Sequence, residues 1–265
     1  GRSILGNPSA MKRIGRRDLL EYVQARYHPS KLVISVAGNF NTRTLLSLLN
    51  RSLGKWKPAS LKDIVLPSRT PPSLRTGIFV HPKRLAQTHL CFGLPGIPVN
   101  HPGRYAAHTL NALLGGGMSS RLFQEVREKR GLAYTIYSQL SCFSDSGTFT
   151  IYAATGSKEI GELVDVVRRE LKRLRTRGPA SQELARTKNQ LKGTLMLGLE
   201  GTYGRMNKLA KDEISQGRYV SLKEMLSEID KISRVQIQNV AQHLLNVEEL
   251  AMTALGPVPR SSFPG

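Results

Sequence analysis

The feature that most limits how this chain can fold is a glycine-rich stretch that runs from Gly115 to Tyr134. Its three opening glycines permit backbone conformations that a Cβ atom would block. Ser119 and Ser120 follow, and we expect their hydroxyls to cap a short helix by accepting from its free N–H groups. Gly131 suits the end of that helix, and the residues beyond it have the β-branched and aromatic content of a strand. The stretch therefore predicts a loop, a short helix, a turn and a strand.

Two polar side chains occupy defined places in this pattern. Arg127 falls in the last turn of the expected helix and Tyr134 near the start of the expected strand. A helix and strand folded back on each other would bring the two side chains together. Structural roles are open for both, since an arginine at a helix end offsets the helix dipole and a strand tyrosine often packs in the core. On spacing alone, these structural roles are the stronger interpretation.

The first part of the chain predicts a small unit that lacks strand partners. Helices are expected at Asp18–Tyr27 and Thr42–Leu53, on either side of an apolar run at Leu32–Ala37 that is typical of a buried strand. A single strand cannot make a sheet, so this unit has to borrow strands from outside the sequence. Residues 55–75 then carry four prolines and are interpreted as a linker.

The remainder predicts an α+β domain with one sheet of roughly four to six strands. Apolar and β-branched segments indicate strands at 77–80, 87–93, 134–142, 148–154 and 250–255. Helical spacing of apolar residues indicates helices at 103–114, 159–174, 182–200, 202–216, 221–230 and 234–245.

Charge and hydropathy limit the function classes. The chain has 39 Lys and Arg against 19 Asp and Glu, a net charge of +20, which indicates affinity for polyanions or an acidic partner. A nucleic-acid-binding module is therefore one hypothesis, although the cations are scattered and no aromatic residues interleave with them for base stacking. No apolar run approaches 18 residues, so we expect no membrane span and a cytoplasmic location.

Common catalytic and metal-binding motifs do not occur in the sequence. The six histidines stand in neither H-E-x-x-H nor H-x-x-E-H, and there is no G-x-S-x-G nucleophile elbow. Cys91 and Cys142 are expected to be free, buried thiols, with a disulfide as the open alternative. We therefore expect no metal ion to be held by this chain.

Several segments together resemble one protein family. Gly115–Tyr137, with Leu110–Leu113, Lys188–Gly193, Gly1–Gly6 and Asp18–Tyr22, is similar to the C-terminal portion of the M16 zinc metallopeptidases. This is the insulinase, pitrilysin and mitochondrial-processing-peptidase family, and the bacterial processing-protease type is the nearest match. The resemblance implies the LuxS/MPP-like fold, in which each of two similar domains packs a mixed β-sheet against helices.

The resemblance also implies a domain division and a missing partner. Residues 1–57 would be the end of a first, zinc-binding domain, 58–70 a linker, 71–256 a complete second domain and 257–265 a tail. The family's zinc ligands, an H-x-x-E-H motif and a distal Glu, belong to the first domain at positions that would precede residue 1. Zinc and the N-terminal zinc-binding half, in the same longer chain or in a separate subunit, are therefore the implied cofactor and partner.

For the site, the resemblance implies that Arg127 and Tyr134, spaced R-x6-Y, meet a peptide substrate across a closed chamber. Arg127 would anchor the peptide backbone and Tyr134 would donate to the developing oxyanion. The implied substrate-binding residues nearby are Gly115, Gly116, Gly117 and Ser119. The chain would then be the C-terminal half of a zinc metalloendopeptidase. A non-catalytic M16-like partner subunit is the alternative, and homodimerisation stays open.

Overall fold

The computed structural model describes residues 4–56, 70, 72–258 and 263. Its contacts divide the chain into two units, Gly1–Thr70 with Thr202–Ile214, and Pro71–Gly201 with Ser215–Gly265. We describe each unit by itself. The linker predicted at 58–70 and most of the tail predicted at 257–265 lie outside the described residues.

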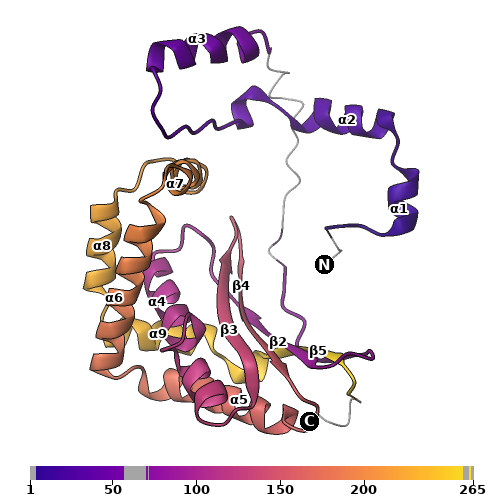
Figure 1. Ribbon diagram of the computed structural model, residues 1–265, viewed down its shortest axis with the longest axis vertical. Coiled ribbons are helices and arrows are strands. Elements are labelled where there is room, and N and C mark those ends of the chain that lie inside the picture. The colour runs from indigo at the N-terminus through magenta and orange to yellow at the C-terminus, as the bar shows by residue number, and fades with distance from the viewer. Residues whose placement is uncertain (1–3, 57–69, 71, 259–262, 264–265) are drawn as a thin grey trace. The chain divides into compact units, whose positions relative to one another are not determined.

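The larger unit is built on a five-stranded sheet with the order β1-β5-β2-β4-β3 (Figure 1). β1 runs parallel to β5 and the other neighbours are antiparallel, so the sheet is mixed. The expected sheet of four to six strands in an α+β domain is confirmed. The strands are β1 (Gly77–Pro82), β2 (Thr88–Pro95), β3 (Ala133–Cys142), β4 (Gly147–Thr155) and β5 (Ala251–Gly256).

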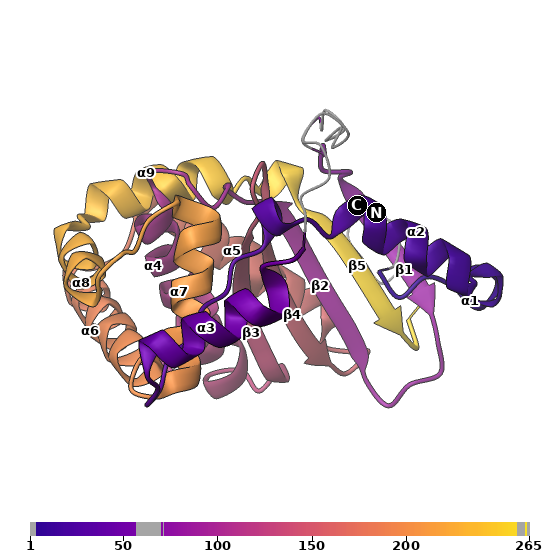
Figure 2. The same cartoon turned by 90° about the horizontal axis from the view of Figure 1, so that it is seen from above.

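Helices cover one face of this sheet. In Figure 1 the helices α4, α5 and α9 lie together against the strands, and α6 and α8 pack beyond α4, as the view from above also shows (Figure 2). Every one of them begins and ends within a few residues of its predicted bounds. The helices are α4 (Arg104–Gly115), α5 (Ile160–Arg177), α6 (Ser181–Gly198), α8 (Leu222–Lys231) and α9 (Arg234–Leu244).

The core lies between the sheet and these helices, because alternate strand residues point to opposite faces. Leu90 and Phe92 of β2 and Phe149 of β4 are buried on the helix side. Cys91, between the first two, is exposed on the other face. Cys91 and Cys142 are both free, as predicted, but the prediction that Cys91 is buried is wrong, because its place in the strand alternation turns it away from the core.

A glycine allows α4 to approach β3 closely. Gly115, the last residue of α4, is buried, and a Cβ atom there would lie 2.6 Å from Ser138 Oγ and still closer to Ser138 N. Ser138 Oγ donates to the carbonyl oxygen of Asn111 at 3.1 Å, which fixes the strand against the same helix end. Gly115 is therefore explained by helix–strand packing.

We expect Gly115→Ala to destabilise the larger unit. The added methyl group meets the backbone of β3, which cannot move aside, and overpacking of this kind costs about 1–3 kcal/mol. Gly193→Ala in α6 is the control, because nothing lies within 4 Å of its Cβ position and the helix propensity of alanine favours it. Denaturant unfolding should show a loss for the first variant and no loss for the second; equal stability of the two would contradict this packing.

The smaller unit consists of short helices and the first part of α7. The helices are α1 (Pro8–Arg13), α2 (Arg16–Arg26), the 3₁₀ turn η1 (Pro29–Lys31), α3 (Thr42–Leu53) and α7 (Thr202–Gln216). α7 groups with this unit as far as Ile214. Ser35 Oγ donates to the carbonyl oxygen of Met206 at 2.9 Å within this unit.

The strand predicted at Leu32–Ala37 does not form. No strand is assigned there among the described residues, and Leu32, Val33 and Ile34 are exposed. The physical reason is the one that the sequence raised, since an extended segment without a neighbouring strand has no partners for its backbone N–H and C=O groups. The apolar run is present, but the part of the chain that the structure describes does not bury it.

Candidate functional site

Arg127 and Tyr134 meet on the surface of the larger unit. The Arg127 guanidinium carbon lies 4.3 Å from the centre of the Tyr134 ring and 4.7 Å from that of Phe123. These are cation–π distances. The predicted proximity of the two side chains is confirmed. Tyr134 is 74% exposed, so core packing, the structural alternative for this tyrosine, does not explain it.

A wide helical turn carries Arg127 to this position. The segment η3 (Phe123–Glu128) is π-helical, and Lys129 N donates to the carbonyl oxygen of Gln124 five residues earlier. π-turns of this kind are rare in proteins overall, and those that occur are often found at functional sites. The sequence predicted a short helix here and gave no signal for the wider turn.

The turn that leads to Tyr134 depends on Gly131. Gly131 has φ of 63°, in the left-handed region that favours glycine. Its N–H donates to the carbonyl oxygen of Arg127 at 3.0 Å, and Leu132 N donates to that of Val126 at 2.9 Å. One of these hydrogen bonds encloses the other, as in the Schellman motif that ends many α-helices. Each spans one residue more than in that motif, because the helical turn before it is π-helical. The predicted helix stop at Gly131 is confirmed.

A β-bulge then sets the direction of Tyr134. On β3, Ala133 pairs with Thr155 and Thr135 with Ala154, so Tyr134 is the extra residue opposite β4. Bulges redirect side chains in this way, often near functional sites. Tyr134 and Thr135 are both exposed, after which the regular alternation resumes. Strand propensity alone did not reveal this bulge.

The glycines proposed to contact substrate occupy different environments. Gly115 is buried against β3, Gly117 is partly buried and Gly116 is exposed. A Cβ atom on Gly117 would lie 2.7 Å from Gln190 Nε2 of α6. Gly116 is exposed, but a Cβ atom there would lie 2.5 Å from the Cα atom of Ala112, so the close approach of backbone requires glycine at this position as well.

The serines after the glycines do not cap the helix. Ser120 Oγ donates to the carbonyl oxygen of Gly117 at 2.5 Å, and Ser119 Oγ donates to Gln190 Oε1 at 3.2 Å. The predicted acceptance from helix N–H groups is thus wrong, since both hydroxyls act as donors that close the loop and tie it to α6. Ser119 is exposed and lines a surface cavity of about 450 Å³ with Arg121 and Gln124.

The face of the sheet that turns away from the helices carries a group of aromatic side chains. The rings of Tyr137 and Tyr152, opposite each other on β3 and β4, have centroids 5.2 Å apart. His89 of β2 lies 2.7 Å from the Tyr152 hydroxyl through its Nδ1. Sequence analysis did not select the two tyrosines, although the period-2 alternation of both strands was a signal that they share the exposed face.

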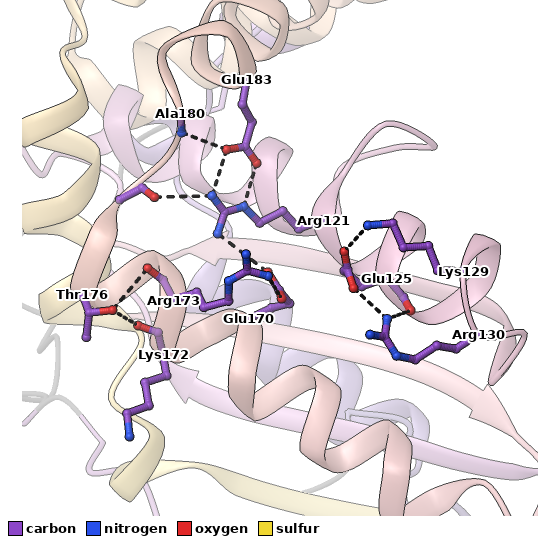
Figure 3. Close-up of polar contacts among 11 residues, drawn as sticks. Arg121, Glu125, Lys129, Arg130, Glu170, Lys172, Arg173, Thr176, Ala180 and Glu183 are labelled. Atoms are coloured by element: carbon purple, nitrogen blue, oxygen red, sulfur yellow. Dashed lines mark hydrogen bonds and ion pairs between the residues drawn. The ribbon is translucent and has the colours of Figure 1, made fainter.

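Ion pairs connect Arg121, six residues before Arg127, with glutamates of α5 and α6 (Figure 3). Arg121 donates to both carboxylate oxygens of Glu183, from Nε at 2.6 Å and from Nη2 at 2.8 Å. Its Nη1 lies 3.7 Å from Oε2 of Glu170, whose side chain is almost fully buried. Arg173 donates to the other oxygen of Glu170 at 2.8 Å. One guanidinium therefore bridges carboxylates on α5 and α6.

Arg121 also determines the protonation of its partner. Burial by itself raises the pKa of Glu183. The hydrogen bond and charge of Arg121, together with the backbone N–H of Ala180, lower the pKa by more than burial raises it, so the pKa lies below its ordinary value. The carboxylate of Glu183 additionally accepts from Ala180 N at 3.1 Å, which completes the N-terminal cap of α6. Glu183 thus stays charged and holds two elements at once.

This pKa shift predicts how stability depends on pH. A carboxyl whose pKa is lowered on folding stabilises the protein above its unfolded pKa, about 4.3, and that contribution disappears as the pH falls through the folded pKa. Glu183→Gln should therefore cost roughly 1.5–3 kcal/mol at pH 7 and progressively less below about pH 4.

Denaturant unfolding of the wild type and of Glu183→Gln, from pH 7 down to pH 3, measures the difference in their free energies of unfolding. Glu228→Gln is the control, because Glu228 forms an exposed ion pair with Lys231 within α8 and should cost little at any pH. A deficit for Glu183→Gln that stays constant down to pH 3 would contradict the assignment of the shift to Glu183.

The described residues contain no site for a metal ion. Across 4–56, 70, 72–258 and 263, no three His, Cys, Asp or Glu side chains come together as ligands. Nor does any helix in this described part combine the length and apolar character that crossing a membrane requires. The described residues therefore do not offer the three or four ligands that a zinc ion takes.

Sequence comparison places most of the chain in one family. A family model described as the peptidase M16 inactive domain matches residues 13–191. An uncharacterized zinc protease of Bacillus subtilis is 34% identical over 97% of this chain, and one of Streptomyces coelicolor is 32% identical over 97%. The chain spans 61% and 57% of the length of these two curated relatives.

Solved structures share the fold. A protease from Helicobacter pylori aligns over 96% of this chain with a TM-score of 0.85 and 20% identity. A peptidase M16 inactive domain from Pseudomonas fluorescens aligns over 97% with a TM-score of 0.81 and 21% identity. This chain covers 62% and 61% of those two chains.

Proposed function

Since the chain belongs to the peptidase M16 family, we propose that it is the C-terminal half of a zinc endopeptidase and presents Arg127 and Tyr134 to a peptide substrate. The zinc ligands would come from an N-terminal half, in the same longer chain or in a separate subunit. Two findings support this division: the chain covers only about 60% of relatives named zinc proteases, and its described residues contain no metal site.

The observation that carries the proposal is the contact of Arg127 with an exposed Tyr134. Hydrolysis of a peptide bond builds negative charge on the scissile carbonyl oxygen, and donors that are already positioned stabilise that charge. The phenol O–H of Tyr134 can donate to this oxygen. The guanidinium of Arg127 stays charged at any working pH and donates without accepting. We assign Tyr134 to the oxyanion and Arg127 to a neighbouring backbone carbonyl.

Stacking also supports these roles. A solvent-exposed tyrosine normally explores several rotamers, and ordering it costs conformational entropy. The Arg127 guanidinium lies over the rings of both Tyr134 and Phe123. These contacts restrict the Tyr134 side chain before substrate binds, so less conformational entropy is lost on binding. The exposed Gly116 and Ser119 are the proposed peptide contacts with the best access to solvent, and packing at all three glycines supports the shape of the loop that presents them.

We expect Tyr134→Phe to lower turnover roughly ten- to a thousandfold when the zinc-binding half is supplied, in cis or in trans, because one oxyanion donor is lost. Arg127→Ala should lower kcat/KM by weakening substrate anchoring. The measurement is hydrolysis of a quenched fluorescent peptide, with circular dichroism to verify folding.

Tyr219→Phe is the matched control, because Tyr219 is also exposed but lies outside the site. Wild-type turnover in both site variants would leave Arg127 and Tyr134 as structural residues and end the proposed assignment. An assembly that contains an intact zinc site yet hydrolyses no peptide would instead favour the non-catalytic partner subunit.

An exposed apolar segment in the smaller unit also supports a zinc-binding N-terminal half as the partner. We propose that residues 1–57 are the end of the zinc-binding domain and that 71–256 form the complete second domain. Leu32, Val33, Ile34 and Val36 are exposed, and apolar segments of this kind mark surfaces that another part of a protein covers. Strands of the N-terminal half would pair with this segment.

Addition of the N-terminal half should therefore slow amide hydrogen exchange at residues 32–37, because the new backbone hydrogen bonds protect these N–H groups. Hydrogen-exchange mass spectrometry with and without that half measures the effect. Amides in the core of α5 serve as the internal control, since they are buried already. Unchanged exchange at 32–37 in a complex of proven stoichiometry would contradict this docking.

A further inference from the structure

The segment that carries Arg127 is held on two sides by different kinds of contact. Leu122 and Val126 are fully buried and fix its depth against the core. Apolar contacts are non-directional, so by themselves they do not fix how the segment is rotated about its axis or how far it is shifted along the core. The stacking of Arg127 on an exposed ring is too weak to fix them.

Arg121 supplies the directional contact. It precedes Arg127 by six residues in the same helical segment, and its side chain is only 17% exposed. The two parallel hydrogen bonds to Glu183 form the bidentate arrangement that fixes orientation as well as distance. A further contact runs from Arg121 Nη2 to the carbonyl oxygen of Gly178 at 3.4 Å, in the turn between α5 and α6.

The other ion pairs of the segment cannot replace this contact. Lys129 and Arg130 both donate to Glu125 at 2.6 Å, and all three residues belong to the same stretch of chain (Figure 3). Arg130 also approaches Glu162 of α5, but at 3.9 Å and with a glutamate that is 61% exposed, so this contact holds the segment weakly. Contacts inside the segment stiffen it but do not place it on α5 and α6.

We propose that Arg121 is a positioning residue that acts through Arg127. By clamping the start of the segment to Glu183 and Glu170, it sets where the end of the segment presents Arg127 over Tyr134. This inference rests on the proposed function for its kinetic consequence, but the placement of Arg127 on the Tyr134 ring is measurable without any reaction.

Two conservative variants test this role. Arg121→Lys keeps the positive charge beside buried Glu170 but loses the planar fork, and Glu183→Gln keeps the shape of the partner but loses its charge. Lys129→Gln is the matched control, because it removes an ion pair of the same length that stays inside the segment. Thermal unfolding identifies any variant that fails to fold, in which case the other variant decides.

The first readout is spectroscopic. In the chain labelled with ¹⁵N,¹³C-arginine, the ring current of Tyr134 should shift the Arg127 side-chain resonances, and Tyr134→Leu supplies the reference without the ring. Arg121→Lys and Glu183→Gln should move these resonances toward the reference, whereas Lys129→Gln should leave them unchanged. Resonances that stay at their wild-type positions in both folded test variants would overturn the inference.

The second readout is kinetic and uses the chain together with the zinc-binding half. Misplacement of a reacting group by a distant change can cost on the order of a hundredfold, so Arg121→Lys should lower kcat/KM about ten- to a hundredfold. The same change in an Arg127→Ala background should have little further effect, because residues that act through each other are non-additive. An equal loss in both backgrounds would overturn the inference.

These readouts separate the inference from the proposed function. If Arg127→Ala alone keeps wild-type turnover, the proposed role of Arg127 fails, and the NMR comparison still decides whether Arg121 places it. If Arg127→Ala lowers turnover while Arg121→Lys and Glu183→Gln leave both readouts unchanged, the proposed function stands and the positioning role of Arg121 is wrong.

Discussion

One-sided burial of the five-stranded sheet is the constraint on which the rest of the larger unit depends. Leu90, Phe92, Phe149 and Ile151 are each at most 1% exposed on the helix side, and burial of such a side chain stabilises by about 1.5–3 kcal/mol. Because strand residues alternate, the same pairing that buries these residues places polar and aromatic side chains on the other face. The fold therefore provides a rigid platform and an accessible surface at once.

The candidate site occupies the end of this platform where the regular structure changes. A π-turn, a left-handed glycine and a β-bulge follow one another within about a dozen residues, and each departs from the ideal helix or strand. Irregularities of this kind persist when the surrounding structure over-determines them. Here the surroundings are buried Leu122 and Val126 below the segment and the carboxylates of Glu170 and Glu183 beside it.

The net charge of the chain does not describe the charges around the candidate site. The total of +20 suggested a polyanionic partner, yet around the candidate site the cations are paired with glutamates: Arg121 with Glu183, Arg173 with Glu170, and Lys129 and Arg130 with Glu125. These pairs orient helices. Arg127 differs from these cations because it stacks on the exposed ring of Tyr134, while its Nε lies 3.7 Å from Oε1 of the neighbouring, half-exposed Glu128.

The sequence by itself determined the secondary structure of the larger unit, the number of strands and the R-x6-Y spacing, because hydrophobic periodicity and glycine placement are local properties. It also revealed that Leu32–Ala37 is an apolar run, but whether that run becomes a strand depends on partner strands, which the described residues do not supply. Tertiary structure alone decided that Tyr134 sits on a bulge, that the hydroxyls of Ser119 and Ser120 donate, and that Arg121 reaches Glu183 sixty-two residues away. Register, turn width and long-range ion pairs arise from packing between segments distant in sequence, and no local pattern encodes them.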